Sequence, residues 1–160
     1  METLQTLTLL LATITMGLSA GLFYAYSHDI MPGLGLSDDR TFVAGFQAVD
    51  KAIYNPWFMI GFLGAPVLTG LAALLHLGAD HRPVLVLTVV AFVLYLATVV
   101  ITARVNLPLN AEIQAAGDPD RIPDLAAVRE RFEARWVRWN LIRTVLAVAA
   151  FASVAWALSL

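Results

Sequence analysis

The sequence predicts an all-α membrane protein: a four-transmembrane-helix bundle, one domain over residues 1–160, with two amphipathic interfacial helices on one side. Composition is the first reason, because 59% of residues are hydrophobic, 14% are charged and the mean hydropathy is +0.76, whereas soluble domains are about half apolar and a quarter charged. The second reason is a set of four long, charge-poor runs. We therefore expect the lipid bilayer to be a partner of this chain.

Each run has about the 20 residues that a hydrocarbon core about 30 Å thick requires. The runs cover residues 4–26, 57–77, 84–103 and 141–160, and none contains an acidic side chain. The first run could instead be a signal peptide. However, the residues before it include the acidic Glu2 and no Lys or Arg, and its apolar length exceeds that of a signal core. Pro66 in the second run frees a backbone carbonyl, so we expect a kink that a neighbouring helix or Thr69 accommodates.

The connections between the runs are unequal. Residues 78–83 form a tight turn, whereas residues 26–56 and 104–138 are long and fall on the side opposite both termini. In the first long connection Ser37 is a candidate helix cap, and apolar residues follow it at helical spacing: Phe42, Phe46, Val49 and Ile53. Pro123 and Asp124 open a second polar helix that could continue into the fourth run as one rod.

Basic residues predict the orientation, because cytoplasmic loops retain Lys and Arg. Nine of the ten lie on the side of the long connections, and Arg82 alone lies with the termini. We therefore predict a multi-pass protein of the cell membrane with cytoplasmic long connections and both termini outside.

Several chemistries lack sequence support. The chain has no cysteine, and its net charge of −2 does not indicate a nucleic-acid partner. His76 and His81 lie on the side opposite His28, so three imidazoles cannot converge and no metal site is predicted. Phosphate-loop, nucleophile-elbow and zinc motifs are also missing, so no cofactor is expected.

Polar residues gather where the third and fourth runs meet the long connections. Asn106 and Asn110 flank Pro108, where amides also commonly cap helices or occupy turns. Trp136, Asn140 and Arg143 share one helical face, and Trp139 lies beside it. This set suits a flat, oxygen-bearing ligand, although an aromatic and basic belt at the membrane boundary also explains Trp and Arg.

His28 ends the first run on the same side as this cluster. With a pKa near 6.5 in its unperturbed state, an imidazole can remove a proton at neutral pH, and Asp29 or Asp50 could orient it. The alternative is a structural histidine at the membrane interface.

The chain resembles the anthrone oxygenase family of small four-helix membrane proteins over nearly its whole length. The resemblance rests on residues 17–32, 46–47, 106–110 and 136–144, of which the last two segments are the most specific. The family pattern has an asparagine three positions after Gln47, where this chain has Asp50.

The resemblance implies oxidation of an anthrone, a flat aromatic substrate, to an anthraquinone with molecular oxygen and without metal or flavin. In that interpretation His28 is the base, helped by Asp50, and Arg143 stabilises the substrate oxyanion. The remaining residues would bind the substrate: Gln47, Asn106, Asn110, Trp136, Trp139 and Asn140. The sequence leaves open a non-catalytic module that binds a small lipophilic ligand or assists a partner protein, a purely structural role, and self-association into a homo-oligomer.

Overall fold

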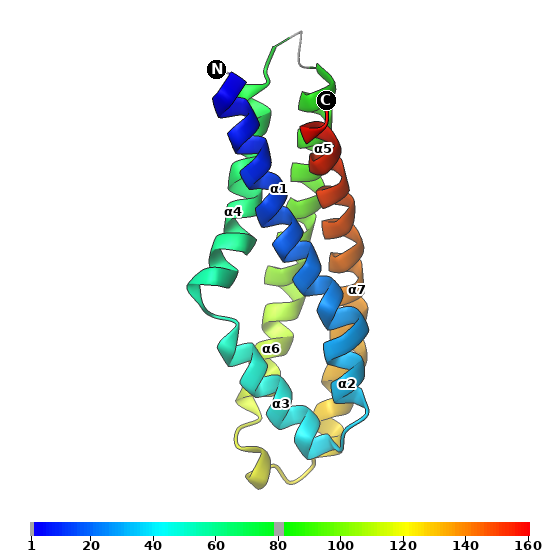
Figure 1. The fold of residues 1–160 in the computed structure, drawn as a ribbon. Helices are drawn as coiled ribbons and strands as arrows, with labels where there is room; N and C mark the ends of the chain where they lie inside the picture. Colours follow the sequence, from blue (N-terminus) through cyan, green and yellow to red (C-terminus); the bar gives the residue numbers. More distant parts are fainter. Residues whose placement is uncertain (1, 79–81) are drawn as a thin grey trace.

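The computed structural model describes residues 2–78 and 82–160, and nearly all of this part is helical. The long helices are α1 (Glu2–Ala25), α4 (Pro56–Leu75), α5 (Arg82–Ile101) and α7 (Leu125–Leu158). α1 packs against α4 and α7, and α5 packs against the same two helices, so the four close into a ring. Both termini lie at the end where α4 stops and α5 starts (Figure 1). Four stretches are long and apolar enough to cross a membrane, which confirms the predicted fold class. Residues 79–81 of the predicted tight turn, including His81, lie outside the described residues.

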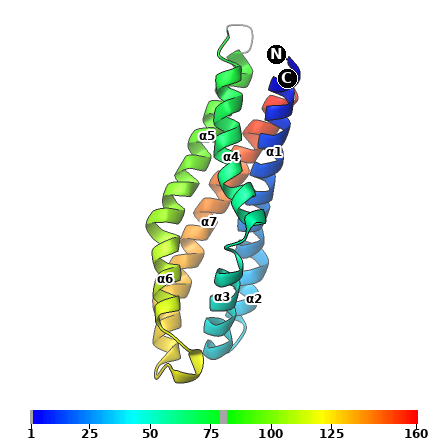
Figure 2. The same ribbon diagram turned by 90° about the vertical axis from the view of Figure 1, so that its left-hand side faces the viewer.

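Three of the rods are longer than the predicted spans. The continuous helical stretches Glu2–Gly35, Arg82–Ala115 and Leu125–Leu158 have 34 residues each. At 1.5 Å per residue each is about 50 Å long, about 20 Å more than a hydrocarbon core. The bundle therefore has two parts (Figure 2). We call residues 2–25, 56–75, 82–101 and 141–158 the membrane half, and residues 31–52, 107–115 and 125–138 the protruding half.

The two predicted polar helices help to build the protruding half. α3 (Asp39–Ala52) buries its apolar stripe against α2 (Met31–Gly35), α6 (Leu107–Ala115) and α7. α3 thus occupies in the protruding half the place that α4 occupies in the membrane half. The helix is interrupted between them, and Asn55 caps α4. The second polar helix and the fourth span form one continuous helix, α7, as the sequence predicts.

The predicted cap of α3 was wrong by one residue. Asp38 accepts a hydrogen bond from the Thr41 backbone N–H at 2.9 Å, whereas the Ser37 hydroxyl donates to the Leu34 carbonyl at 2.6 Å. A carboxylate at this position also interacts favourably with the helix dipole. Ser37 therefore bonds back to α2, and Asp38 is the residue that caps α3.

Two π-helical turns connect the halves, η1 (Tyr26–Ile30) and η3 (Thr102–Asn106). Each precedes a proline by two residues, Pro32 or Pro108. Proline lacks an N–H and its ring clashes with the carbonyl one turn earlier, so a wider turn relieves the clash. The residue before each proline bonds back over five positions, to the carbonyl of Tyr26 or of Thr102.

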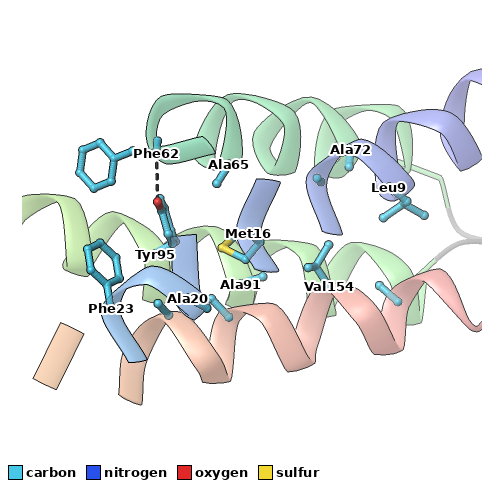
Figure 3. Packing of buried hydrophobic residues seen from close by; sticks show 14 of the residues in the cluster. Leu9, Met16, Ala20, Phe23, Phe62, Ala65, Ala72, Ala91, Tyr95 and Val154 are labelled. Atoms are coloured by element: carbon cyan, nitrogen blue, oxygen red, sulfur yellow. Dashed lines mark hydrogen bonds between the residues drawn. The ribbon is translucent and has the colours of Figure 1, made fainter. Parts of the chain in front are cut away.

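Pro66 leaves the Phe62 carbonyl without its helical donor. The Tyr95 hydroxyl of α5 donates to that carbonyl at 3.1 Å (Figure 3). The Thr69 hydroxyl bonds to the Ala65 carbonyl instead. A neighbouring helix therefore accommodates the proline, which is one of the two outcomes that the sequence left open.

Candidate functional site

Arg143 lies inside the bundle near the junction of the two halves, and it is 5% exposed. Its Nη1 donates to the Thr102 hydroxyl at 3.0 Å, and its Nη2 donates to the Asn140 side-chain oxygen at 2.8 Å. The guanidinium carbon is 4.7 Å from the centre of the Phe23 ring and 5.6 Å from that of Trp136. Two neutral acceptors and two aromatic rings thus hold the group, while its Nε has no partner within the described chain.

Asn106 is 1% exposed and ends the π-helical turn η3. Neither its amide nitrogen nor its amide oxygen has a hydrogen-bond partner among the described residues. An unsatisfied buried polar atom costs about 1–3 kcal/mol, so such atoms normally have a partner. Asn106 and the Nε of Arg143 together offer two donors and one acceptor to a ligand.

A cavity of about 150 Å³ adjoins these side chains. The elements around it are α1 with η1, the α3–α4 junction, η3 with α6, and α7. Aromatic side chains form much of its wall: Phe23, Tyr26, Phe46, Tyr54, Phe58, Phe62 and Trp136. Asn106, Arg143, Thr102, Asn110 and Asp50 supply the non-aromatic polar part of the wall. A flat apolar molecule with a few oxygens matches this lining.

Asp50 is buried at one side of the cavity and is held by two amides. Asn110 Nδ2 donates to its Oδ1 at 2.6 Å, and Gln114 Nε2 donates to its Oδ2 at 2.9 Å. The indole N–H of Trp136 donates to the Asn110 side-chain oxygen at 2.8 Å. Burial and the negative charge of Asp50 raise the pKa of Tyr54 above its ordinary value. The Tyr54 hydroxyl therefore remains protonated beside this carboxylate.

Two of the predicted binding residues, Asn140 and Gln47, hold the elements around the cavity together through hydrogen bonds. Asn140 donates to the Phe23 carbonyl at 3.1 Å and to the Ser27 hydroxyl at 2.8 Å, in addition to accepting from Arg143. Gln47 donates to the Ile113 and Gly117 carbonyls at 2.7 and 3.0 Å, which attaches α3 to the end of α6. Neither side chain lines the cavity.

The structure does not bring His28 or Trp139 to the cavity wall. The His28 ring is exposed, packs on Tyr24 with ring centres 4.0 Å apart, and places Nδ1 2.6 Å from the Tyr24 carbonyl. Trp139 is half-buried on α7. Arg143, Asp50, Asn106, Asn110 and Trp136 are the predicted residues that do line the cavity.

Sequence reasoning missed Tyr26, Tyr54 and Thr102. Tyr26 lies two residues before His28 and faces inward where His28 faces outward. Thr102 precedes Asn106 by four residues, a spacing that places both on one side of a helix, and this signal could have identified it. Tyr54 lies in the break between α3 and α4, where helical spacing carries no information.

Residues 2–78 and 82–160 contain no group of three His, Cys, Asp or Glu side chains that could hold a metal ion. His76 lies near the terminal end of the bundle, with Nδ1 2.7 Å from the Ala72 carbonyl. His81 is outside the described residues.

The sequence profile described as anthrone oxygenase matches residues 55–153, more than half of the chain. The chain belongs to the anthrone oxygenase family. The family match includes Asn106, Asn110, Trp136 and Arg143, whereas Asp50 lies before its first residue. No curated protein and no solved structure matches the chain.

Proposed function

We propose that the protein oxidises a flat phenolic aromatic molecule with molecular oxygen, without metal or flavin. The observation that supports this most strongly is the set of three unpartnered polar atoms, on Asn106 and Arg143, beside a cavity with aromatic walls. Phe23, Phe46 and Trp136 would contact the ring faces. The Nε of Arg143 and the amide of Asn106 would bind the ring oxygens. An anthrone, the substrate class in the family's description, has this combination of rings and oxygen.

We assign the base to Asp50 in preference to His28. The Asp50 side chain lines the cavity, whereas the His28 ring lies outside it. Two amide donors fix the carboxylate, so it is oriented before a substrate arrives. Asn140 would act as a positioning residue, because it accepts a hydrogen bond from Arg143 and is anchored to α1.

The proposed reaction balances without an added reductant. Asp50 removes a proton from the acidic ring CH₂, and the electron pair moves to the ring oxygen, where Arg143 and Asn106 stabilise the negative charge. Oxygen takes one electron, the radical pair combines into a peroxide, and the peroxide takes back the proton. Loss of the second C–H proton with cleavage of the O–O bond leaves C=O and one water. CH₂ and O₂ thus become C=O and H₂O.

The substrate would enter from the bilayer. An apolar cavity of about 150 Å³ has room for about one benzene ring, so the rest of a larger substrate would extend into the mouth. The mouth includes Tyr54, Leu63 and Leu107, which are 58%, 51% and 41% exposed. Leu63 belongs to the membrane half, so part of this opening faces lipid.

The test is anthrone oxidation by purified protein in micelles, measured above the spontaneous rate. Arg143→Gln should lower kcat about 10²–10³-fold, because it removes charge from the oxyanion site. Arg138→Gln, an exposed arginine on the same helix, is the matched control and should retain activity. No turnover by the wild type would refute the oxygenase, and tight anaerobic binding of anthrone in that case would favour a non-catalytic ligand carrier.

A second pair of variants tests the base. Asp50→Asn should lower kcat about 10²–10⁴-fold, the usual contribution of a general base. Asp29→Asn, on the exposed surface beside His28, should not. Loss of activity in His28→Ala but not in Asp50→Asn would return the base to His28.

We also propose that the protruding half faces the cytoplasm, because nine of the ten basic residues lie on its side of the bundle. Reporter fusions at Leu160 test this proposal. If a reporter that works only in the cytoplasm is active when fused to Leu160, the orientation is the reverse of the one proposed.

A further inference from the structure

Asp50 borders two separate spaces. One is the inner cavity with Arg143, and the other is an outer groove between α3 and α6. Four residues line both spaces: Asp50, Tyr54, Leu107 and Asn110. These four side chains form a wall shared by the ligand cavity and the outer groove, and the Asp50 carboxylate is part of that wall.

The outer groove is open to the protein surface and carries several polar side chains. Lys51, Ala111 and Gln114 line this groove but not the inner cavity. Lys51 and Ala111 are exposed, and both belong to the protruding half. Gln114 donates to Oδ2 of Asp50, while Asn110, which donates to Oδ1, also accepts from Trp136 in the cavity wall. The carboxylate is thus hydrogen-bonded on one oxygen to a groove residue and on the other to a residue that reaches the cavity.

We propose that, without oxygen, the protein exchanges the acidic C–H hydrogens of its substrate with those of water. This second activity rests on the proposed role of Asp50 as the base. Asp50 takes the proton from carbon, trades it for a solvent hydrogen through the outer groove, and returns that hydrogen to carbon. In D₂O the net reaction is C–H + D₂O → C–D + HDO, with no change of oxidation state.

Oxidation and hydrogen exchange differ in whether Asp50 must contact solvent. During oxidation Asp50 can return both protons to the departing oxygen, so no proton has to cross to bulk water. Exchange requires contact between the carboxylate and solvent, which the outer groove supplies. Filling the groove should therefore slow exchange and spare oxidation.

The experiment follows the methylene ¹H signal of anthrone in D₂O under nitrogen, with protein in micelles. Wild type should speed the loss of this signal at least about tenfold over the spontaneous rate, and Asp50→Asn should abolish the acceleration. Ala111→Trp places an indole in the outer groove alone and should slow exchange several-fold, while aerobic turnover stays within about twofold of wild type. Ala115→Trp is the matched control, because Ala115 is exposed one turn further along α6 and lines a different groove.

Each outcome separates this inference from the proposed function. Aerobic turnover without anaerobic exchange would overturn the exchange activity and leave the oxygenase standing. Exchange without aerobic turnover would refute the oxygenase alone. If Ala111→Trp and Ala115→Trp slowed exchange equally, or neither did, the outer groove would not be the route.

Discussion

The membrane half and the protruding half are packed with different side chains. Of the fifteen described residues in the buried core of the membrane half, eight are alanine. Of the nine in the second core, centred on the protruding half, none is alanine and five are aromatic: Tyr26, Phe42, Phe46, Phe132 and Trp136. Lipid tails are as apolar as leucine, so membrane helices associate by close backbone approach over small residues. In water, burial of large aromatic surfaces is the stronger driving force.

The cavity lies where one kind of packing gives way to the other. Its wall takes Phe23 and Phe62 from the membrane core and Tyr26, Phe46 and Trp136 from the second core. Helices that touch over alanine must separate to admit these rings. The site is therefore located by the change in packing, and the following predictions test that contrast in order of decreasing effect.

Phe132→Ala should cost the most stability, about 3–5 kcal/mol, because it leaves a cavity in the aromatic core. The Phe132 ring lies 4.4 Å from that of Phe46 and 6.2 Å from those of Phe42 and Trp136. Denaturant unfolding in micelles measures the change. Trp156→Ala is the control, because Trp156 is 66% exposed on the membrane half, and an equal loss there would contradict the contrast.

Ala91→Leu should cost about 1–3 kcal/mol by overpacking. Ala91 is 0% exposed in the alanine-rich core, so the added carbons would push helices apart. Val93→Leu, at a 58% exposed position on the same helix, should be close to neutral. A neutral Ala91→Leu would show that the membrane half does not depend on close approach.

Tyr95→Phe should cost about 1 kcal/mol, since it leaves the Phe62 carbonyl unpaired between helices. In a Pro66→Ala background residue 66 regains an N–H that can donate to this carbonyl. The cost of Tyr95→Phe should then shrink. Identical costs in the two backgrounds would mean that the proline and the tyrosine are not coupled.

Arg40→Ala should leave the unfolding midpoint unchanged within error. Arg40 and Asp120 pair at 2.6 Å, but both side chains are more than half exposed. The Arg40 guanidinium holds the pKa of Asp120 below its usual range, so the pair's contribution is present above the ordinary carboxyl pKa and is lost as the pH falls through the lowered one. A midpoint shift that salt does not screen would show a contribution beyond the surface pair.

The sequence was sufficient for the spans, because apolar length is a property of consecutive residues. It also singled out Arg143 and Asn106 as candidates, since polar groups in or beside an apolar run are conspicuous, whereas Asp50 was considered only as a helper of His28. It did not show where each continuous helical stretch ends, because the stretches that begin with α1 and α5 run past the apolar residues to Gly35 and Ala115. The second core, in the protruding half, depends on contacts between distant segments. The hydropathy of the polar stretch before the fourth span therefore did not reveal it.

The sequence also did not show which side chains point into the bundle and which point outward. Tyr26 and His28 are two residues apart, and η1 turns the first inward and the second outward. A π-helical turn changes the angle between successive side chains, so an ordinary helical wheel misplaces residues beyond it. The position of Asp50 opposite Asn110 was likewise not apparent, because the hydrogen bond joins α3 and α6 across 60 positions of sequence.

The two π-helical turns also set the rotational phase of the protruding half relative to the membrane half. Each inserts an extra residue into the helical repeat. Removing Arg104, which lines neither space, from η3 would restore an ordinary turn and rotate α6 by about 100° about its axis. Asn110 would then point away from Asp50. Every residue that lines the inner cavity or the outer groove would still be present in the chain, and the lipid-facing surface would be unchanged. A length change of a single amino acid at this turn would thus dismantle the wall without altering any of its side chains.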